Sequence, residues 1–171
     1  MSVRFPDGYT LEKLGKAHQR TRFDCGTEEV NTWLRINARQ SQQKHLSVTR
    51  VLITPGNSIA GYYTLAIGQV NMDALPHKYA RNLPRTMLPI ITLAWLGVDK
   101  DHQGSGLGKR LLASALQDCF HTGKKIPSVA VLLDCLNKKV KEFYQHFDFQ
   151  EMPGYPMKLV LPWKLLEEMM E

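Results

Sequence analysis

A glycine-rich segment from Gln103 to Lys109 carries the clearest chemical signal in this sequence. It reads Gln-Gly-Ser-Gly-Leu-Gly-Lys, and apolar residues at helical spacing follow it as far as Cys119. Glycines let several backbone N–H groups point at one spot, and a helix N-terminus adds the positive end of its dipole. The segment therefore predicts a site for an anion such as a phosphate group.

Glycine spacing separates three kinds of phosphate loop. A Walker loop would need a glycine at position 103 and a serine or threonine directly after Gly108-Lys109, and neither is present. The dinucleotide fingerprint would need a third glycine where Lys109 follows Gly104 and Gly106. The pattern that fits is Gln-x-x-Gly-x-Gly, which begins at Gln103. A glycine-rich turn that serves only close helix packing is the alternative interpretation.

This pattern resembles the cofactor loop of the GNAT family of N-acetyltransferases, where it follows a strand ending in a pair like Val98-Asp99. The resemblance implies one GNAT domain over residues 1–171, with an α/β fold. Its mixed, mostly antiparallel central sheet would splay at the cofactor site and be flanked by helices. The co-substrate would be acetyl-CoA, with its pyrophosphate on the loop and its pantetheine arm along the preceding strand. The expected cofactor-binding residues are Leu96, Val98, Gln103, Gly104, Ser105, Gly106, Leu107, Gly108, Lys109 and Asn137.

Other segments resemble a narrower group, the GNAT-type toxins of bacterial toxin–antitoxin modules. These segments are Arg22–Gly26, Trp33–Leu34, Gly61–Leu65, Pro84–Leu93 and Phe143–Tyr144. The resemblance implies an enzyme that acetylates the α-amino group of aminoacyl-tRNA and so blocks translation. It also implies a cognate antitoxin and a homodimer. The alternatives are a GNAT enzyme acting on a small amine or a protein amino group, and a binding module without catalysis.

Acetyl transfer from a thioester to an amine makes modest demands on side chains. A free α-amino group titrates at about 7.7 to 8.0, and esterification lowers this value, so no strong base is required. The backbone N–H of Val98 is the natural oxyanion donor. By analogy with the family, the Tyr144 hydroxyl protonates the departing thiolate. Without that analogy, Tyr144 is a core aromatic residue. Asn137 either contacts the pantetheine arm or only caps its helix.

The charge distribution favours a polyanionic partner. The net charge is +6, and Glu167, Glu168 and Glu171 lie among the last five residues, so the body of the chain is more basic and its tail is acidic. No acidic residue lies between Asp73 and Asp99. The candidates for contacts with charged tRNA are Arg35, Arg39, Lys78, Arg81 and Arg85, with Trp95 as a stacking residue. Arg35 and Arg39 could equally be an ordinary solvated helix face, and Trp95 stands where the toxin pattern commonly has arginine.

Composition limits the remaining function classes. Three cysteines without a Cys-x-x-Cys pair and six histidines without shared ligand spacing indicate neither a disulfide framework nor a metal site. No run of apolar residues suggests a membrane span or a signal peptide. We therefore expect a cytoplasmic protein that uses no metal.

Hydrophobic periodicity and turn residues predict an α/β succession of elements. Helices are expected after Thr27 as N-cap, after Ser105, and after Asn137, and a long loop with at most one short helix is expected over 71–89. The expected strands are 9–14, 48–54, 59–70, 90–98, 129–135, 149–152 and 157–163.

Overall fold

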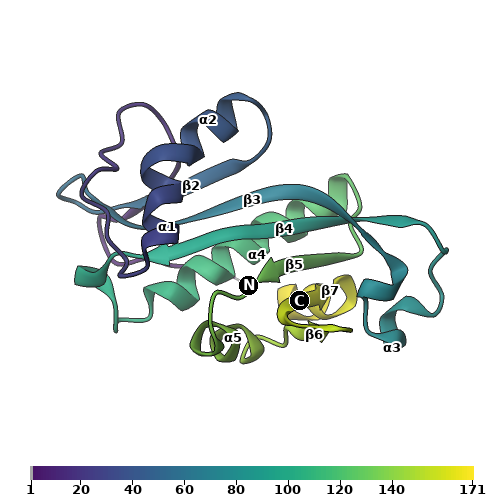
Figure 1. Ribbon diagram of the computed structural model, residues 1–171. Coiled ribbons are helices and arrows are strands. Elements are labelled where there is room, and N and C mark those ends of the chain that lie inside the picture. The colour runs from purple at the N-terminus through teal and green to yellow at the C-terminus, as the bar shows by residue number, and fades with distance from the viewer. Residues whose placement is uncertain (1) are drawn as a thin grey trace. The chain divides into compact units, whose positions relative to one another are not determined.

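The computed structural model describes residues 2–171 (Figure 1). Its strands form a seven-stranded sheet in the order β1-β2-β3-β4-β5-β7-β6. β4 and β5 pair in parallel, whereas β1–β2, β2–β3, β5–β7 and β6–β7 pair antiparallel. By internal contacts the described chain divides into two compact units. We call residues 2–66 with 93–116 the first unit, and residues 67–92 with 117–171 the second unit.

The first unit contains the glycine-rich loop. Its elements are β1 (Thr10–Lys13), β2 (Val48–Ile53), the first part of β3 (Ile59–Asn71), the last part of β4 (Met87–Val98), α1 (Glu28–Thr32), η1 (Trp33–Asn37), α2 (Ala38–Gln43), η3 (Lys100–His102) and the first part of α4 (Leu107–Lys125). Apolar residues from α1, η1 and α2 pack against β2 and β3, as in the cluster of Val30, Leu34, Val51 and Tyr62. This core holds the helices on the strands that lead to the loop.

The first helix contains a π-helical turn that periodicity did not predict. Trp33–Asn37 forms η1 between two α-helical segments, and such widened turns are frequent at functional sites. Thr27 occupies the N-cap position as expected, but its side chain makes no capping hydrogen bond. Apolar side chains of this helix face the core, where Val30, Leu34 and Ala38 are buried and Trp33 is partly buried.

The second unit contains Tyr144. Its elements are the remaining parts of β3, β4 and α4, together with η2 (Met72–Ala74), α3 (His77–Ala80), β5 (Ala130–Asp134), α5 (Lys138–Gln145), β6 (Gln150–Met152), β7 (Tyr155–Pro162) and α6 (Trp163–Met170). Leu75 and Ala80 bury the 71–86 segment against Leu88, Ile90 and residues of the last strands. The segment expected as a long loop is thereby ordered, and it holds two short helices.

The second unit differs from the prediction in the start of β4 and in the presence of α6. β4 begins at Met87 instead of Ile90, since Pro89, taken as a boundary, keeps its carbonyl and accepts a hydrogen bond from the Val129 N–H at 2.9 Å. α6 was not predicted at all. It begins at Trp163, whose ring stacks on Phe120 with centroids 5.4 Å apart.

A membrane span would need a long and strongly apolar helix within residues 2–171. No helix of this part of the chain is both long and apolar enough to cross a bilayer.

Candidate active site

The glycine-rich loop enters α4 with the N–H groups of residues 104–109 unpaired within the described part of the chain, residues 2–171. Gly104 and Gly106 have φ angles of +85° and +83°, which an L side chain rarely adopts, and a Cβ on either would meet no atom within 4 Å. The first helical bond of α4 runs from the Arg110 N–H to the Gly106 carbonyl at 3.3 Å. The N–H groups of the preceding helical residues therefore have no intrahelical partner. Such an open loop fits a pyrophosphate.

The side chain of Gln103 does not face the anion position. Its amide donates to the carbonyls of Cys25 and Val98, each at 2.9 Å. The glutamine of the motif therefore ties the loop to two other segments of the first unit. The backbone N–H of Gln103 donates to the Lys100 carbonyl at 3.5 Å. The cofactor contact that we predicted for Gln103 from the sequence stays a prediction.

A second segment, Asp24–Gly26, holds the same loop. The Asp24 N–H donates to Asp99 Oδ1 at 3.0 Å, and the Lys100 N–H donates to the Asp24 carbonyl at 2.8 Å. Lys100 Nζ lies 3.0 Å from Asp24 Oδ2. The buried Asn31 amide donates to Asp24 Oδ1 at 3.0 Å. We call this set, with Gln103, the loop clamp.

The charges of Asp24 and Lys100 stabilise the loop clamp. Hydrogen bonds from the Gly26 N–H, from Lys100 and from Asn31 lower the pKa of Asp24 from its usual 3.8 to about 2. The same contact with Asp24 raises the pKa of Lys100. Both groups are therefore charged at neutral pH, and their ion pair crosses from the Asp24–Gly26 segment to the start of the loop.

One edge of β4 offers backbone groups for an extended ligand. The Asp99 N–H donates to the Ala60 carbonyl of β3 at 2.8 Å. Because N–H groups alternate between the two edges of a strand, those of Val98 and Leu96 point to the opposite edge. β4 pairs with β5 over Ile91 and Thr92, earlier in the strand. This arrangement suits the predicted pairing with a pantetheine arm.

Gly97 lets the first helix approach β4 closely. A Cβ at this position would lie 2.7 Å from Val30 Cγ1 and 3.5 Å from the rings of Phe23 and Tyr62. The Tyr62 hydroxyl donates to the Val30 carbonyl at 2.6 Å and anchors α1 there. Gly97 therefore allows the close packing of α1 on β4.

Tyr144 of α5 is 6% exposed and packs among aromatic rings. Phe143 and Phe149 meet it edge to face, with centroids 5.2 and 5.6 Å away. Burial raises the pKa of Tyr144, and the charge of a Cys135 thiolate would raise it further. Among residues 2–171 no partner hydrogen-bonds to its hydroxyl. Tyr144 therefore keeps its proton at neutral pH and has it available to donate.

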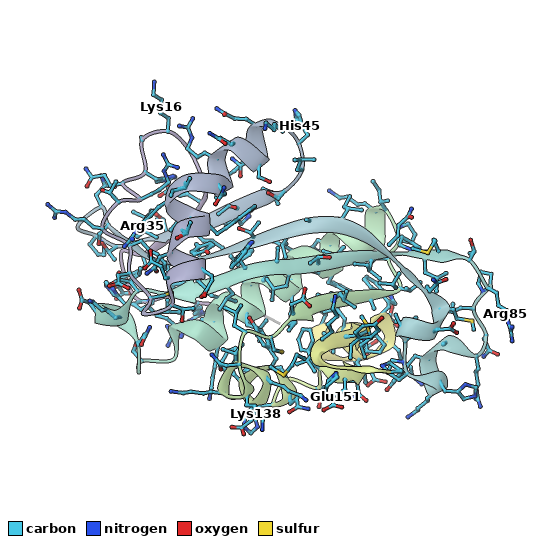
Figure 2. All side chains as sticks on the ribbon, viewed as in Figure 1. Lys16, Arg35, His45, Arg85, Lys138 and Glu151 are labelled. Atoms are coloured by element: carbon cyan, nitrogen blue, oxygen red, sulfur yellow. The ribbon has the colours of Figure 1, made fainter. Side chains whose placement is uncertain are left out.

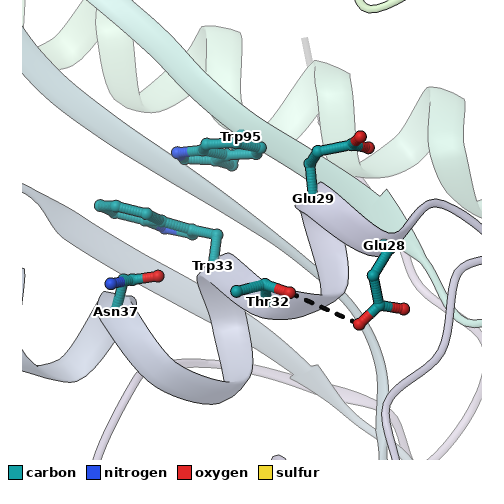
Figure 3. A pocket seen from close by; sticks show the side chains of 6 residues that line it. All are labelled: Glu28, Glu29, Thr32, Trp33, Asn37 and Trp95. Atoms are coloured by element: carbon teal, nitrogen blue, oxygen red, sulfur yellow. Dashed lines mark hydrogen bonds between the residues drawn. The ribbon is translucent and has the colours of Figure 1, made fainter.

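Trp95 and Trp33 form the wall of an open hollow of about 350 Å³ in the first unit (Figure 3). Their indoles stack with centroids 5.4 Å apart and planes at 13°. Glu28, Glu29, Thr32 and Asn37 complete the lining. We expected Trp95 to stack on a base, but one face of its indole is already taken by Trp33.

A family model described as an acetyltransferase (GNAT) domain matches residues 57–151 of the chain. This range includes the loop and Tyr144, and it covers more than half of the 171 residues. The chain belongs to the GNAT family. The predicted enzyme class, an N-acetyltransferase that uses acetyl-CoA, is thereby confirmed.

Relatives of this GNAT chain include bacterial toxins. A protein of Mycobacterium tuberculosis named tRNA-acetylating toxin is 33% identical over 92% of this chain and 94% of its own length. The solved structure of AtaT complexed with acetyl-methionyl-tRNAfMet matches with a TM-score of 0.87 and 25% identity over 95% of this chain and 99% of that chain. A second solved structure contains a tyrosine-to-phenylalanine mutant of AtaT bound to the C-terminus of the antitoxin AtaR and acetyl-CoA. It matches with a TM-score of 0.80 and 25% identity over 96% of this chain and 99% of that chain. The predicted fold, a mixed and mostly antiparallel sheet with helices, is confirmed.

In this GNAT structure Asn137 caps α5. Its side-chain oxygen accepts from the Val140 N–H at 2.9 Å, as one of our two interpretations predicted. A contact between the remaining amide N–H groups and a cofactor stays a prediction.

The basic candidates differ in exposure. Arg35 is half-buried: its guanidinium donates to the Phe23 carbonyl and lies 3.8 Å from Glu28 Oε1 (Figure 2). This differs from the open phosphate ligand that we predicted, because the side chain is already used to fix the first helix. Arg39 is partly exposed. In the second unit, Lys78, Arg81 and Arg85 are exposed, and Arg85 projects from the segment after α3.

The thiols of this GNAT chain take no visible part in the site. Cys25, Cys119 and Cys135 are free, and burial raises the pKa of Cys119 to about 12. In the described chain, no three His, Cys, Asp or Glu side chains gather where they could hold a metal ion.

Sequence reasoning missed the clamp residues Asp24, Asn31 and Lys100. The sequence did single out Arg22–Gly26 as a segment resembling the toxins, without assigning it a role. Its contacts with the loop now explain why those residue types stand there.

Proposed function

We propose that this GNAT enzyme is a toxin that transfers an acetyl group to the α-amino group of aminoacyl-tRNA and blocks translation. The observation that carries the proposal is the similarity, over 92% of the chain, to a protein named tRNA-acetylating toxin. An AtaT structure that contains acetyl-methionyl-tRNAfMet supports the aminoacyl group as acceptor. Exposed cations at Lys78, Arg81 and Arg85 suit a polyanionic substrate.

Acetyl-CoA supplies an activated acyl group as a thioester. In our proposal the N–H groups of the loop from Gln103 to Lys109, including Ser105 and Leu107, hold its pyrophosphate. The backbone edge of Leu96 and Val98 aligns its extended arm, and the Val98 N–H stabilises the oxyanion.

Tyr144 acts as the general acid in this proposal. It donates its proton to the departing sulfur, and the raised pKa of its buried hydroxyl keeps that proton available at neutral pH. The acceptor amine needs no strong base, since an α-amino group titrates at about 7.7 to 8.0 and its ester titrates lower.

The proposal extends to assembly and location. Residues 1–171 form one GNAT domain, an assignment supported by a family match at 57–151 that includes segments of both units. The enzyme acts in the cytoplasm, where charged tRNA is found, as a homodimer with a cognate antitoxin. The AtaT structure with the C-terminus of AtaR supports the antitoxin.

Incubation with radiolabelled acetyl-CoA tests the proposal directly. We expect label on total charged tRNA, released by mild base as N-acetylated amino acids, and no label on the same tRNA after deacylation. Label on polyamines or peptides alone would assign a different amine substrate. Turnover of the thioester on no amine would indicate a binding module.

A further inference from the structure

The hollow that the stacked Trp33 and Trp95 line has a lining that suits one class of aminoacyl group. We propose that it receives the amino-acid side chain of the charged tRNA and selects cationic side chains, those of lysyl- and arginyl-tRNA. This inference depends on the proposed function, because it names the preferred substrate of that reaction.

The charge of the hollow is opposite in sign to the net charge of the whole chain. The chain carries +6, yet among the described residues the hollow is lined by Glu28 and Glu29 and by no cation (Figure 3). Glu28 lies 3.8 Å from Arg35 Nη1, whereas Glu29 makes no ion pair with any of residues 2–171. Carboxylates repel phosphate groups, so this hollow does not suit the tRNA backbone. A positive group would neutralise Glu29.

The two indoles form a rigid platform for such a group. The Trp33 Nε1–H donates to Thr64 Oγ1 at 2.9 Å, and Thr64 Oγ1 lies 2.7 Å from Thr49 Oγ1. Both threonines are fully buried, so Trp33 is fixed before a ligand arrives. Trp95 stacks on it. Indole rings attract ammonium and guanidinium groups, and the attraction strengthens as water is excluded.

The position of Trp95 on β4 determines how long the side chain of the aminoacyl group must be to reach the hollow. Trp95 precedes Val98, the proposed oxyanion donor, by three residues, which at strand spacing is about 10 Å. Residues 95 and 97 of a strand face the same side, so the Trp95 side chain lies on the strand face where a Cβ at Gly97 would meet Val30 of α1. Glycyl and alanyl groups are too short to reach the hollow from a reacting amine at Val98. Lysine and arginine have long apolar stems that can lie along the indoles.

The test compares acetylation of individually charged tRNAs. We expect kcat/KM for lysyl- and arginyl-tRNA to exceed that for methionyl- and glycyl-tRNA by about tenfold, the size of one well-formed cation–π contact. Glutamyl-tRNA should be the poorest substrate because its side chain is repelled by Glu29. Equal values across the set, or a preference for small or apolar aminoacyl groups, would overturn the inference while leaving the proposed function intact.

Variants separate the hollow from general effects on tRNA binding. Glu29→Gln and Trp95→Arg should each bring the ratio of lysyl to methionyl acetylation close to one. The control Glu168→Gln removes an exposed carboxylate of the tail and should leave that ratio unchanged. An unaltered ratio in both hollow variants, with acetyl-CoA binding retained, would show that selection occurs elsewhere. Acetylation of no charged tRNA would overturn the proposed function, and this inference with it.

Discussion

At the scale of single residues, Tyr144 illustrates how environment assigns chemistry to a common side chain. Its ring lies among Phe143 and Phe149, a setting that alone would describe a core residue. Its hydroxyl has no partner within residues 2–171, and its pKa is raised by burial. A buried phenol that keeps its proton can serve as an acid at neutral pH.

Replacing Tyr144 by Phe removes only this hydroxyl. We expect the rate of acetyl transfer to fall by about 10²- to 10⁴-fold, the usual contribution of a general acid. The Kd for acetyl-CoA, measured by calorimetry, should change little because the ring remains. Tyr155→Phe, at an exposed position on β7, is the matched control. A Tyr144→Phe enzyme with the wild-type rate would remove Tyr144 from the mechanism.

At the scale of elements, the loop before α4 depends on backbone conformation and on the clamp. Gly104 and Gly106 adopt positive φ angles, and the side chains of Gln103 and Asp99 fasten the loop to the Asp24–Gly26 segment. The open N–H groups can therefore be in position before the cofactor binds. Such preorganisation lowers the entropic cost of binding.

Gly106→Ala tests the positive φ angle. The added Cβ meets no atom, so the effect comes from backbone strain, which costs about 1 to 2 kcal/mol for an L residue in this region. We expect weaker acetyl-CoA binding by calorimetry, as the loop shifts to relieve the strain.

Gly154→Ala is a matched control for this variant. Gly154 has the same φ of +83°, with equally open surroundings, but lies between β6 and β7. It should lower the melting temperature similarly and leave the Kd for acetyl-CoA unchanged. Equal losses of affinity in both variants would contradict a specific role of Gly106.

The clamp predicts a pH dependence of stability. Because the folded-state pKa of Asp24 is lowered from 3.8 to about 2, its contribution is complete above pH 4 or so and disappears as pH falls through 2. Asp24→Asn should therefore melt below the wild type at pH 6, and the gap should narrow between about pH 4 and 2. The exposed Asp7→Asn change should produce no such gap. A gap that is constant with pH would argue against the ion pair with Lys100.

At the scale of the whole molecule, charge is the property that bears on the substrate. The chain carries +6, and the segment between Asp73 and Asp99 contains bases without acids. Lys78, Arg81 and Arg85 are all exposed there, whereas Arg35 is engaged within the first unit. A polyanion would release counterions on meeting these side chains.

Salt titration measures this contribution. The logarithm of the tRNA association constant should fall linearly with the logarithm of salt concentration. Changing Lys78, Arg81 and Arg85 together to Gln should reduce that slope by about 2, because each neutralised phosphate contributes roughly 0.7 to 0.9 to it. The control changes three other exposed lysines, Lys125, Lys139 and Lys164, to Gln. Equal slopes for both triple variants would place the tRNA contacts elsewhere.

Much of the molecule follows from local pattern. Glycine spacing after β4 predicted the loop, and apolar periodicity predicted most strands and the helices after Thr27, Ser105 and Asn137, because these signals act over a few residues. The helix at Trp163–Met170 escaped prediction, since an acidic tail hid a stripe in which Leu166 is buried. The π-helical turn at Trp33–Asn37 was also not predicted, because its geometry departs from the regular 3.6-residue hydrophobic period of an α-helix.

The sequence by itself therefore predicted an anion-binding loop, the GNAT resemblance and the candidate acid Tyr144. Only the tertiary structure showed that Gln103 is a tether, that Asn137 caps its helix and that Arg35 is internally engaged. Only the folded chain shows that Asp24 contacts Asp99, which lies 75 residues further along the sequence, and that Trp33 stacks on Trp95. Such contacts depend on how distant segments pack, and no local spacing encodes them. The predicted anion site consists of residues that are neighbours in the sequence, whereas the clamp and the hollow form only when distant segments pack together in the folded chain.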